Sequence, residues 1–197
     1  MPTKKRNKIF YIDTNIALDY ITARNRQTID VLTKIKEKGW KCISSSFLSM
    51  ELADYKKDSL FVIEKAMDRK WEIRKILREV YKKDLKLGDF QKVDAWIDEF
   101  EIEYKNFQMY DFLVSNDDWL YAQYISRYSN LNSTDALHLT SAILACKNNA
   151  CQIMITNDKH LKIEGEKMLK PLKSGLKILN TIDVERQFFT RKTRITK

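Results

Sequence analysis

Short apolar runs alternate with longer segments of helical periodicity over most of the chain, and this alternation predicts an α/β fold. The apolar runs contain β-branched residues and end in polar turns, as buried strands of a parallel sheet do. The expected strands span residues 8–12, 40–44, 151–156 and 176–180. Between them, apolar residues recur every three or four positions, which indicates helices that cover the sheet.

Residues 136–148 are apolar almost all round the helix that they are expected to form, so this helix should be buried. Asp135 stands at its start, where an acidic residue is favourable. Asp158 follows the strand expected over residues 151–156. Because ligands of open α/β sheets bind at the carboxyl ends of strands, we expect this part of the chain to contribute to a functional site.

Residues 58–108 are expected to form a helical hairpin inserted into one domain that spans residues 1–197. A helical pattern covers residues 58–87, Gly88 interrupts it, and a second apolar seam follows. That seam consists of Phe90, Val93, Ile97, Phe100, Tyr104 and Phe107. Aromatic residues at this density need cover from the parent domain or from a second copy of the chain, so a homo-oligomer is a candidate assembly.

Charge is distributed unevenly along the chain. The net charge is +9, but residues 58–108 total −1, so the remaining residues carry +10. A protein this basic attracts polyanions such as nucleic acid or an anionic membrane. Residues 186–197 form a basic C-terminal tail, and such tails are commonly disordered although their Lys and Arg side chains also suit phosphate contacts.

The three cysteines, Cys42, Cys146 and Cys151, lie in apolar stretches and form no CxxC pair. We interpret them as reduced core residues of a cytoplasmic protein. The apolar run after the basic N-terminus is too short for the core of a signal peptide, and no run is long enough to cross a membrane. We therefore expect no membrane partner.

Four acidic residues form the candidate site. Asp13 follows a strand, Glu51 lies inside a helix beside an apolar stripe, Asp135 begins the buried helix and Asp158 follows another strand. Asp13 also fits an ordinary helix cap, and Glu51 also fits a boundary residue that reaches solvent. Clustered carboxylates repel each other unless a cation neutralises them. Oxygen ligands without a His/Cys set favour Mg²⁺ or Mn²⁺, and such ions can activate water for in-line displacement at phosphorus.

At these residues the chain resembles the PIN-domain nucleases, and among them the VapC-type toxins of toxin–antitoxin pairs. The matching stretches are Ile12-Asp13-Thr14-Asn15, Ser49-Met50-Glu51-Leu52, Thr134-Asp135-Ala136-Leu137-His138-Leu139 and Thr156-Asn157-Asp158-Lys159-His160. The resemblance covers roughly residues 8–57 and 110–182. It implies a Rossmann-like three-layer fold with a central parallel sheet, and metal-dependent cleavage of RNA.

The resemblance also implies roles for individual residues. It places Asp13, Glu51, Asp135 and Asp158 in the catalytic metal site, and it makes supporting polar residues of Thr14, Asn15 and Thr156. It implies Mg²⁺ or Mn²⁺ as the cofactor, RNA as the substrate and a protein antitoxin as a candidate partner. The hairpin expected over residues 58–108 is much longer than the usual connection in that family.

Other interpretations stay open at this point. His138 follows Asp135 by one helical turn and fits a structural role beside the site better than a direct one. A nucleotide-binding enzyme is disfavoured because the chain has no GxGxxG or P-loop glycine pattern. A phosphatase with an aspartyl nucleophile commonly has a second acid two residues later, where this chain has Asn15. A non-catalytic RNA-binding or scaffold protein is the alternative to a metal-dependent endoribonuclease.

Overall fold

The fold is built on a five-stranded parallel sheet, which confirms the predicted α/β class. The structure is a computed structural model that describes residues 7–104 and 107–190. The strands are β1 (Ile9–Ile12), β2 (Lys41–Ser45), β3 (Phe107–Tyr110), β4 (Ile153–Ile155) and β5 (Lys177–Leu179). They lie in the order β3-β2-β1-β4-β5, and every neighbouring pair is parallel.

The strand order reverses direction at β1. From β1 the chain moves outward to β2 and β3, and it then returns to place β4 on the other side of β1. β1 pairs in register with both neighbours, so that Phe10 lies opposite Cys42 of β2 and Ile153 of β4. In sheets of this kind, the crevice at the carboxyl ends of the two strands beside the reversal is the usual binding place. Here those strands are β1 and β4.

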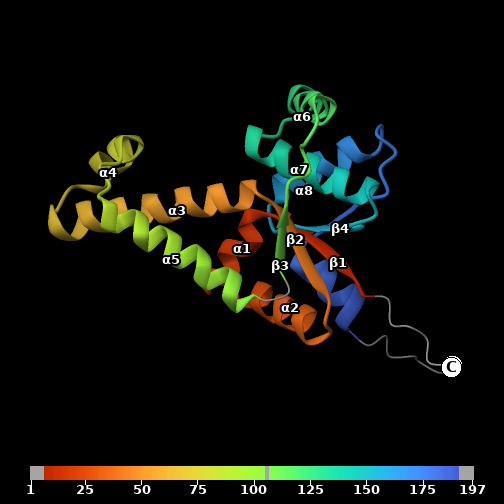
Figure 1. Ribbon diagram of the computed structural model, residues 1–197, viewed down its shortest axis with the longest axis horizontal. Coiled ribbons are helices and arrows are strands. Elements are labelled where there is room, and N and C mark those ends of the chain that lie inside the picture. The colour runs from red at the N-terminus through yellow and green to blue at the C-terminus, as the bar shows by residue number, and fades with distance from the viewer. Residues whose placement is uncertain (1–6, 105–106, 191–197) are drawn as a thin grey trace. The chain divides into compact units, whose positions relative to one another are not determined.

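The chain divides into two compact units, one of residues 1–47 and 106–197 and the other of residues 48–105. The first unit contains the sheet. Its helices α6, α7 and α8 lie on one side of the sheet, and α1 and α2 lie on the other (Figure 1). The helix bounds are α1 (Thr14–Ile21), α2 (Arg26–Glu37), α6 (Asn116–Tyr128), α7 (Ser133–Lys147), α8 (Lys159–Leu169) and α9 (Thr181–Val184), and a π-helical turn η3 (Glu185–Phe189) follows.

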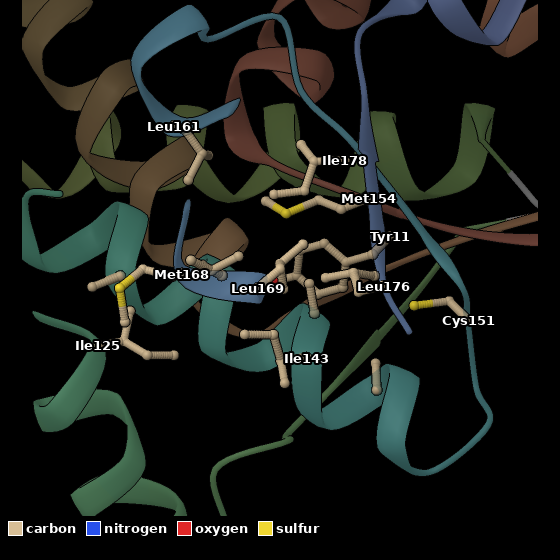
Figure 2. Packing of buried hydrophobic residues seen from close by; sticks show 14 of the residues in the cluster. Tyr11, Ile125, Ile143, Cys151, Met154, Leu161, Met168, Leu169, Leu176 and Ile178 are labelled. Carbon is tan, nitrogen blue, oxygen red and sulfur yellow. The ribbon is translucent and has the colours of Figure 1, made fainter. Parts of the chain in front are cut away.

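One row of side chains across the sheet forms the floor of the larger core. Ile43, Tyr11, Met154 and Ile178 lie side by side in register on β2, β1, β4 and β5. All four are buried in one cluster with side chains of α7 and α8 (Figure 2). Burying each large apolar side chain stabilises the fold by roughly 1.5–3 kcal/mol. As the sequence predicts, α7 is buried along most of its length.

The opposite face of the sheet is covered by aromatic side chains. Phe10 alternates with Tyr11 along β1, and its ring lies 5.9 Å from that of Trp40 and 5.8 Å from that of Phe188. Phe188 belongs to η3, so residues 186–189 of the expected basic tail are helical, and the rings of Phe188 and Phe189 pack against Trp40. Residues 191–197 of that tail lie outside the described residues.

The second unit is a helical pair, but its arms differ from those expected over residues 58–108. The first arm is α3 (Phe47–Ile63), and the second is α5 (Leu87–Glu103). The two helices are drawn at an angle to each other in Figure 1, and Tyr55 of α3 stacks on Trp96 of α5 with ring centroids 6.1 Å apart. Of the expected seam, Val93, Phe100 and Tyr104 are buried, whereas Phe90 is 44% exposed.

A continuous helix was expected over residues 58–87, but residues 64–86 are broken into short pieces. A π-helical turn η1 (Glu64–Asp68) ends before Lys70, whose φ of 51° terminates the helix. A short helix α4 (Ile73–Glu79) and a 3₁₀ turn η2 (Val80–Lys82) follow. The interruption expected at Gly88 falls earlier, because Asp89 accepts a hydrogen bond of 3.1 Å from the backbone N–H of Lys86 and so begins α5 before the glycine.

The expectation of a helical Phe107 was wrong. Phe107 begins β3, where it pairs with Cys42 of β2. β3 is an edge strand whose residues alternate between half-buried and exposed. Over residues 7–104 and 107–190, no helix has both the length and the apolar composition of a membrane-spanning segment.

Candidate functional site

Asp13 and Thr156 meet where the strand order reverses. Asp13 directly follows β1, and Thr156 directly follows β4. The Thr156 hydroxyl donates a hydrogen bond to Oδ2 of Asp13. The other oxygen, Oδ1, accepts from the backbone N–H of Ile16 at 3.0 Å, so Asp13 also caps α1. The structure therefore confirms the helix-cap interpretation of Asp13, and its role in a catalytic site stays a prediction.

The Asp13 carboxylate lies in an environment that disfavours its charge. Its residue is only 2% exposed, and this burial raises the pKa of Asp13 from 3.8 to about 6. The hydrogen bonds from Thr156 and Ile16, and the charge of His138, oppose the rise, whereas the charge of Asp135 adds to it. A buried carboxylate with a second carboxylate near it is stabilised by a cation.

Asp135 is the second acid of this pair. It lies in the first turn of α7, which Asn132 caps by accepting a 2.8 Å hydrogen bond from the Asp135 backbone N–H. The Asn132 side-chain amide in turn donates to Oδ2 of Asp135 at 2.9 Å. The charge of Asp135 adds to the rise in the pKa of Asp13, so the start of α7 interacts electrostatically with the end of β1.

Asp158 is tied to the same edge through Thr156. The backbone N–H of Asp158 donates to the Thr156 hydroxyl oxygen at 3.0 Å. Oδ1 of Asp158 accepts hydrogen bonds from the N–H groups of His160 and Leu161, at 2.7 and 2.9 Å, and so caps α8. One threonine thus fixes both the Asp13 side chain and the turn that carries Asp158.

His138 belongs to a buried polar chain beside the acids. Its Nδ1 lies 2.9 Å from the Tyr11 hydroxyl, and its Nε2 lies 3.1 Å from Oγ1 of Thr14. The Tyr11 hydroxyl donates to Ser45 at 3.1 Å, so it accepts from Nδ1–H of His138. Both ring nitrogens are used within the fold, which fits the structural role expected of His138 and a supporting role for Thr14.

Asn15 lines a polar pocket of about 400 Å³ together with Asp158. The other lining residues are Asp19, Arg24, Asn25 and Asn157. Asp19 and Arg24 were missed by the sequence analysis. The available signal was a charged residue inside the apolar run of α1, since Asp19 follows Leu18 directly and is buried.

Glu51 lies in α3, within the second compact unit. Its side chain is half-buried, and Leu48 and Leu52 on the same helix are buried. This agrees with the expected position at the edge of an apolar stripe. Its assignment to the acidic site stays a prediction from the sequence.

The donor chemistry of the first unit fits a hard divalent cation only in part. Asp13, Asp135 and Asp158 offer carboxylate oxygens, the ligand type that Mg²⁺ and Mn²⁺ prefer. Asp13 and Asp135 interact electrostatically. Yet among the described residues no three His, Cys, Asp or Glu side chains are gathered closely enough to hold a metal ion. The described residues therefore bring Asp13 and Asp135 into electrostatic interaction, but they do not form a complete ligand shell.

The cysteines take no part in this edge. Cys42 and Cys151 are buried and Cys146 is half-buried, each as a free thiol. Burial raises the pKa of Cys151 to about 12, which keeps its thiol protonated and unreactive.

Comparison with known proteins finds similarity to solved structures but not to known sequence families. No family model matches the chain, and no curated protein matches it. Among solved structures, the chain is similar to the crystal structure of VapBC2 from Rickettsia felis bound to a DNA fragment from the promoter of its own genes. The identity is 16%, the TM-score is 0.48, and the match covers 87% of this chain and 98% of that chain.

Proposed function

We propose that this protein is a Mg²⁺- or Mn²⁺-dependent endoribonuclease that hydrolyses phosphodiester bonds at the edge formed by the ends of β1 and β4. The observation that carries the proposal is the buried Asp13 carboxylate. It lies at the reversal of strand order, is held by Thr156, and experiences the like charge of Asp135. Ionising both acids is unfavourable without a cation, which gives the pair a physical reason to bind one.

Asp13 and Asp135 would hold the ion, with Asp158 at the border of the same edge. When bound, such ions activate a water molecule and neutralise charge on the phosphate during in-line displacement. The residues of the chain supply orientation. Ile16 N–H and the Thr156 hydroxyl fix one oxygen each of Asp13, and Asn132 fixes one oxygen of Asp135. The carboxylates are not modified in the reaction, and one of them can relay a proton.

The charge distribution supports a polynucleotide substrate. Residues outside 58–108 carry +10, and this charge attracts the RNA backbone, which the acids alone would repel. The sequence motifs shared with VapC-type toxins support a role as the toxin of a toxin–antitoxin pair, with a protein antitoxin as partner. Co-purification of the chain with the product of an adjacent gene, and loss of RNA cleavage in that complex, would test the toxin role.

The central experiment is cleavage of a labelled single-stranded RNA by purified protein. We expect cleavage with Mg²⁺ or Mn²⁺, none in EDTA, and none for Asp13→Asn or Asp135→Asn. Asp30→Asn is the matched control, because Asp30 is an exposed acid on α2 and its substitution changes the net charge equally. Full cleavage in EDTA contradicts the metal mechanism. Binding of RNA without cleavage under all metal conditions supports the non-catalytic RNA-binding alternative instead.

Glu51 requires its own test, since only the sequence supports its role. Glu51→Gln should abolish cleavage while the thermal unfolding temperature stays near that of the wild type. Asp54→Asn is the control, because Asp54 is an exposed acid on the same helix. Retention of cleavage by Glu51→Gln would remove Glu51 from the site and leave it as a boundary residue.

A further inference from the structure

We propose that the polar pocket beside Asp158 binds a phosphate group of the polynucleotide backbone, with Arg24 as its anion ligand and Asp19 as the residue that positions Arg24. This inference rests on the proposed function, because it adds a substrate contact to the same sheet edge. The pocket holds about 400 Å³ and is lined by Asn15, Asp19, Arg24, Asn25, Asn157 and Asp158.

Arg24 is both anchored and accessible. Its Nε donates to Oδ1 of Asp19, and one of its terminal nitrogens lies 3.5 Å from Oδ1 of Asn15. The Asp19 side chain is 9% exposed, whereas that of Arg24 is 42% exposed. The buried acid therefore fixes the guanidinium through Nε, and the Arg24 side chain stays partly exposed where it lines the pocket. A guanidinium held in this way presents a planar pair of donors, which suits phosphate oxygens.

The wall behind Arg24 is rigid because it is internally hydrogen-bonded. Oδ2 of Asp19 accepts from Asn25, Thr28 and Asn157, at 3.3, 3.1 and 3.0 Å. Oδ1 of Asn157 accepts from the N–H and the hydroxyl of Thr181, at 3.2 and 2.9 Å. These contacts connect α1, α2, the end of β4 and the start of α9. A ligand in the pocket would thus meet Arg24 without rearranging the wall.

The composition of the pocket favours a phosphate over a nucleobase. All of its lining side chains are amides, carboxylates or a guanidinium. Base recognition in single strands generally uses an aromatic or apolar side chain to cover the face of the ring, and this lining provides none. Arg24 is the cation among these residues, so an anionic oxygen is its natural partner.

The position of the pocket relates this phosphate to the acids. Asn15 follows Asp13 by two residues, and Asp158 follows Thr156 by two residues. The pocket thus borders the edge where Asp13 and Thr156 meet. A backbone that crosses this edge would place one phosphate near the acids and a neighbouring phosphate in the pocket. Arg24 supplies positive charge at an edge that otherwise presents carboxylates.

The test measures RNA affinity in EDTA, so that no cleavage is needed. A fluorescent single-stranded RNA is titrated at several salt concentrations with wild type, Arg24→Gln and Arg26→Gln. We expect Arg24→Gln to weaken binding by about fivefold to tenfold and to reduce the slope of log affinity against log salt by about 0.7, the loss of one phosphate contact. Arg26 is exposed, lies two residues away and does not line the pocket, so Arg26→Gln should change affinity by less than about twofold.

Further variants separate the geometry of Arg24 from its charge. Arg24→Lys should keep the salt slope but lose part of the affinity, because an ammonium lacks the paired donors. Arg24→Gln leaves the Asp19 carboxylate without its cationic partner, which can destabilise the fold. If Arg24→Gln unfolds, RNA binding is measured with the double variant Asp19→Asn/Arg24→Gln instead. Its affinity should equal that of Arg24→Gln. An equal loss of affinity for Arg26→Gln and Arg24→Gln would contradict the proposed phosphate site. Binding would then depend on the general positive charge of the protein surface.

The source of the phosphate is tested with matched RNAs that carry or lack a 5′-phosphate. Equal losses for Arg24→Gln on both RNAs support a backbone phosphate, and a loss seen only with the 5′-phosphate overturns it in favour of a terminal phosphate. Failure of the proposed function is distinguishable. If no RNA is cleaved but Arg24→Gln still weakens RNA binding, the phosphate site is supported and the nuclease activity is not. If the wild type cleaves RNA and Arg24→Gln binds RNA as tightly as the wild type, the nuclease activity is supported and the phosphate site is not.

Discussion

Thr156 donates a hydrogen bond from its hydroxyl to Oδ2 of Asp13 and so joins the residues that directly follow β4 and β1. The two strands are neighbours, although Asp13 and Thr156 are 143 positions apart in the sequence. The contact lies where the strand order reverses, which is where parallel sheets leave a crevice for ligands. The topology therefore creates the edge, and Thr156 fixes the acid that occupies it.

We predict that Asp13→Asn stabilises the metal-free protein at neutral pH. The rise in the pKa of Asp13 from 3.8 to about 6 makes its ionisation cost about 3 kcal/mol in the folded state. Asn keeps one oxygen to cap α1, and its amide nitrogen can donate to the Thr156 hydroxyl oxygen in place of the bond that Asp13 accepts. The expected gain in the free energy of unfolding is about 1–3 kcal/mol at pH 7.5, measured by urea denaturation in EDTA.

The pH dependence provides the control for this prediction. A folded acid with a raised pKa holds its proton more tightly than the unfolded chain does. Its contribution to stability is therefore fully present below about pH 4 and is lost as pH rises through about 6. The stability difference between Asp13→Asn and wild type should grow over this interval and level off above it. An equal difference at pH 4.5 and 7.5 would show that the substitution acts through packing or capping.

Asp135→Asn tests the electrostatic coupling between the two acids. Asp135 raises the pKa of Asp13, but less than burial does. In the metal-free variant, the pH at which stability levels off should move slightly below that of the wild type, with a gain under about 1 kcal/mol at pH 7.5. A loss of several kcal/mol would mean instead that Asp135 acts mainly in the first turn of α7.

Thr156→Val should disturb two acids through one hydroxyl. The variant removes the donor to Asp13 and the acceptor for the Asp158 N–H, at an expected cost of about 1–3 kcal/mol. Because the Thr156 hydrogen bond lowers the pKa of Asp13, that pKa should rise further. Mn²⁺ affinity, measured by calorimetry, should fall about tenfold.

Thr156→Ser is the matched control for this variant, since it keeps the hydroxyl and removes only the methyl group. It should retain Mn²⁺ affinity close to that of the wild type. Equal losses of metal affinity in Thr156→Ser and Thr156→Val would assign the effect to packing around the methyl group rather than to the two hydrogen bonds.

The sequence predicts strands well where apolar runs are bounded by polar turns, as β1, β2, β4 and β5 show. Gly39 follows the end of α2, and its φ of +67° suits a glycine. β3 was not predicted from the sequence, because Phe107 continues the spacing of three and four residues between apolar positions of α5. In the structure, α5 ends at Glu103. The apolar periodicity alone does not reveal this change from helix to strand, since it depends on the pairing of β3 with β2.

The candidate site could be predicted only in part for a related reason. Strand ends and helix starts identify Asp13, Asp135 and Asp158, because local patterns mark those positions. The burial of Asp19 was not predicted, because the hydrogen-bond partners that compensate it include residues distant in the sequence. One of them, Asn157, is 138 residues away. Long-range hydrogen bonds determine whether a buried charge is tolerated, and the pattern of residues along the sequence does not show which long-range bonds form.

A last prediction concerns the packing that supports the end of β4. Gly165 of α8 lies so close to β5 that an added Cβ would be 2.5 Å from Cδ1 of Ile178. Gly165→Ala should therefore destabilise the protein by about 1–3 kcal/mol, despite the better helix propensity of alanine. The free energy of unfolding measured in urea tests this cost.

The cause can be assigned with a double-mutant cycle. Ile178→Val removes the clashing Cδ1 atom and should alone cost about 0.5–1.5 kcal/mol. In the double variant Gly165→Ala/Ile178→Val, the new methyl group occupies the space that the valine leaves. The double variant should then be less destabilised than the sum of the single ones by about 1 kcal/mol or more. Additive losses would show that the alanine is accommodated by a shift of α8, in which case the close approach to Ile178 does not constrain residue 165.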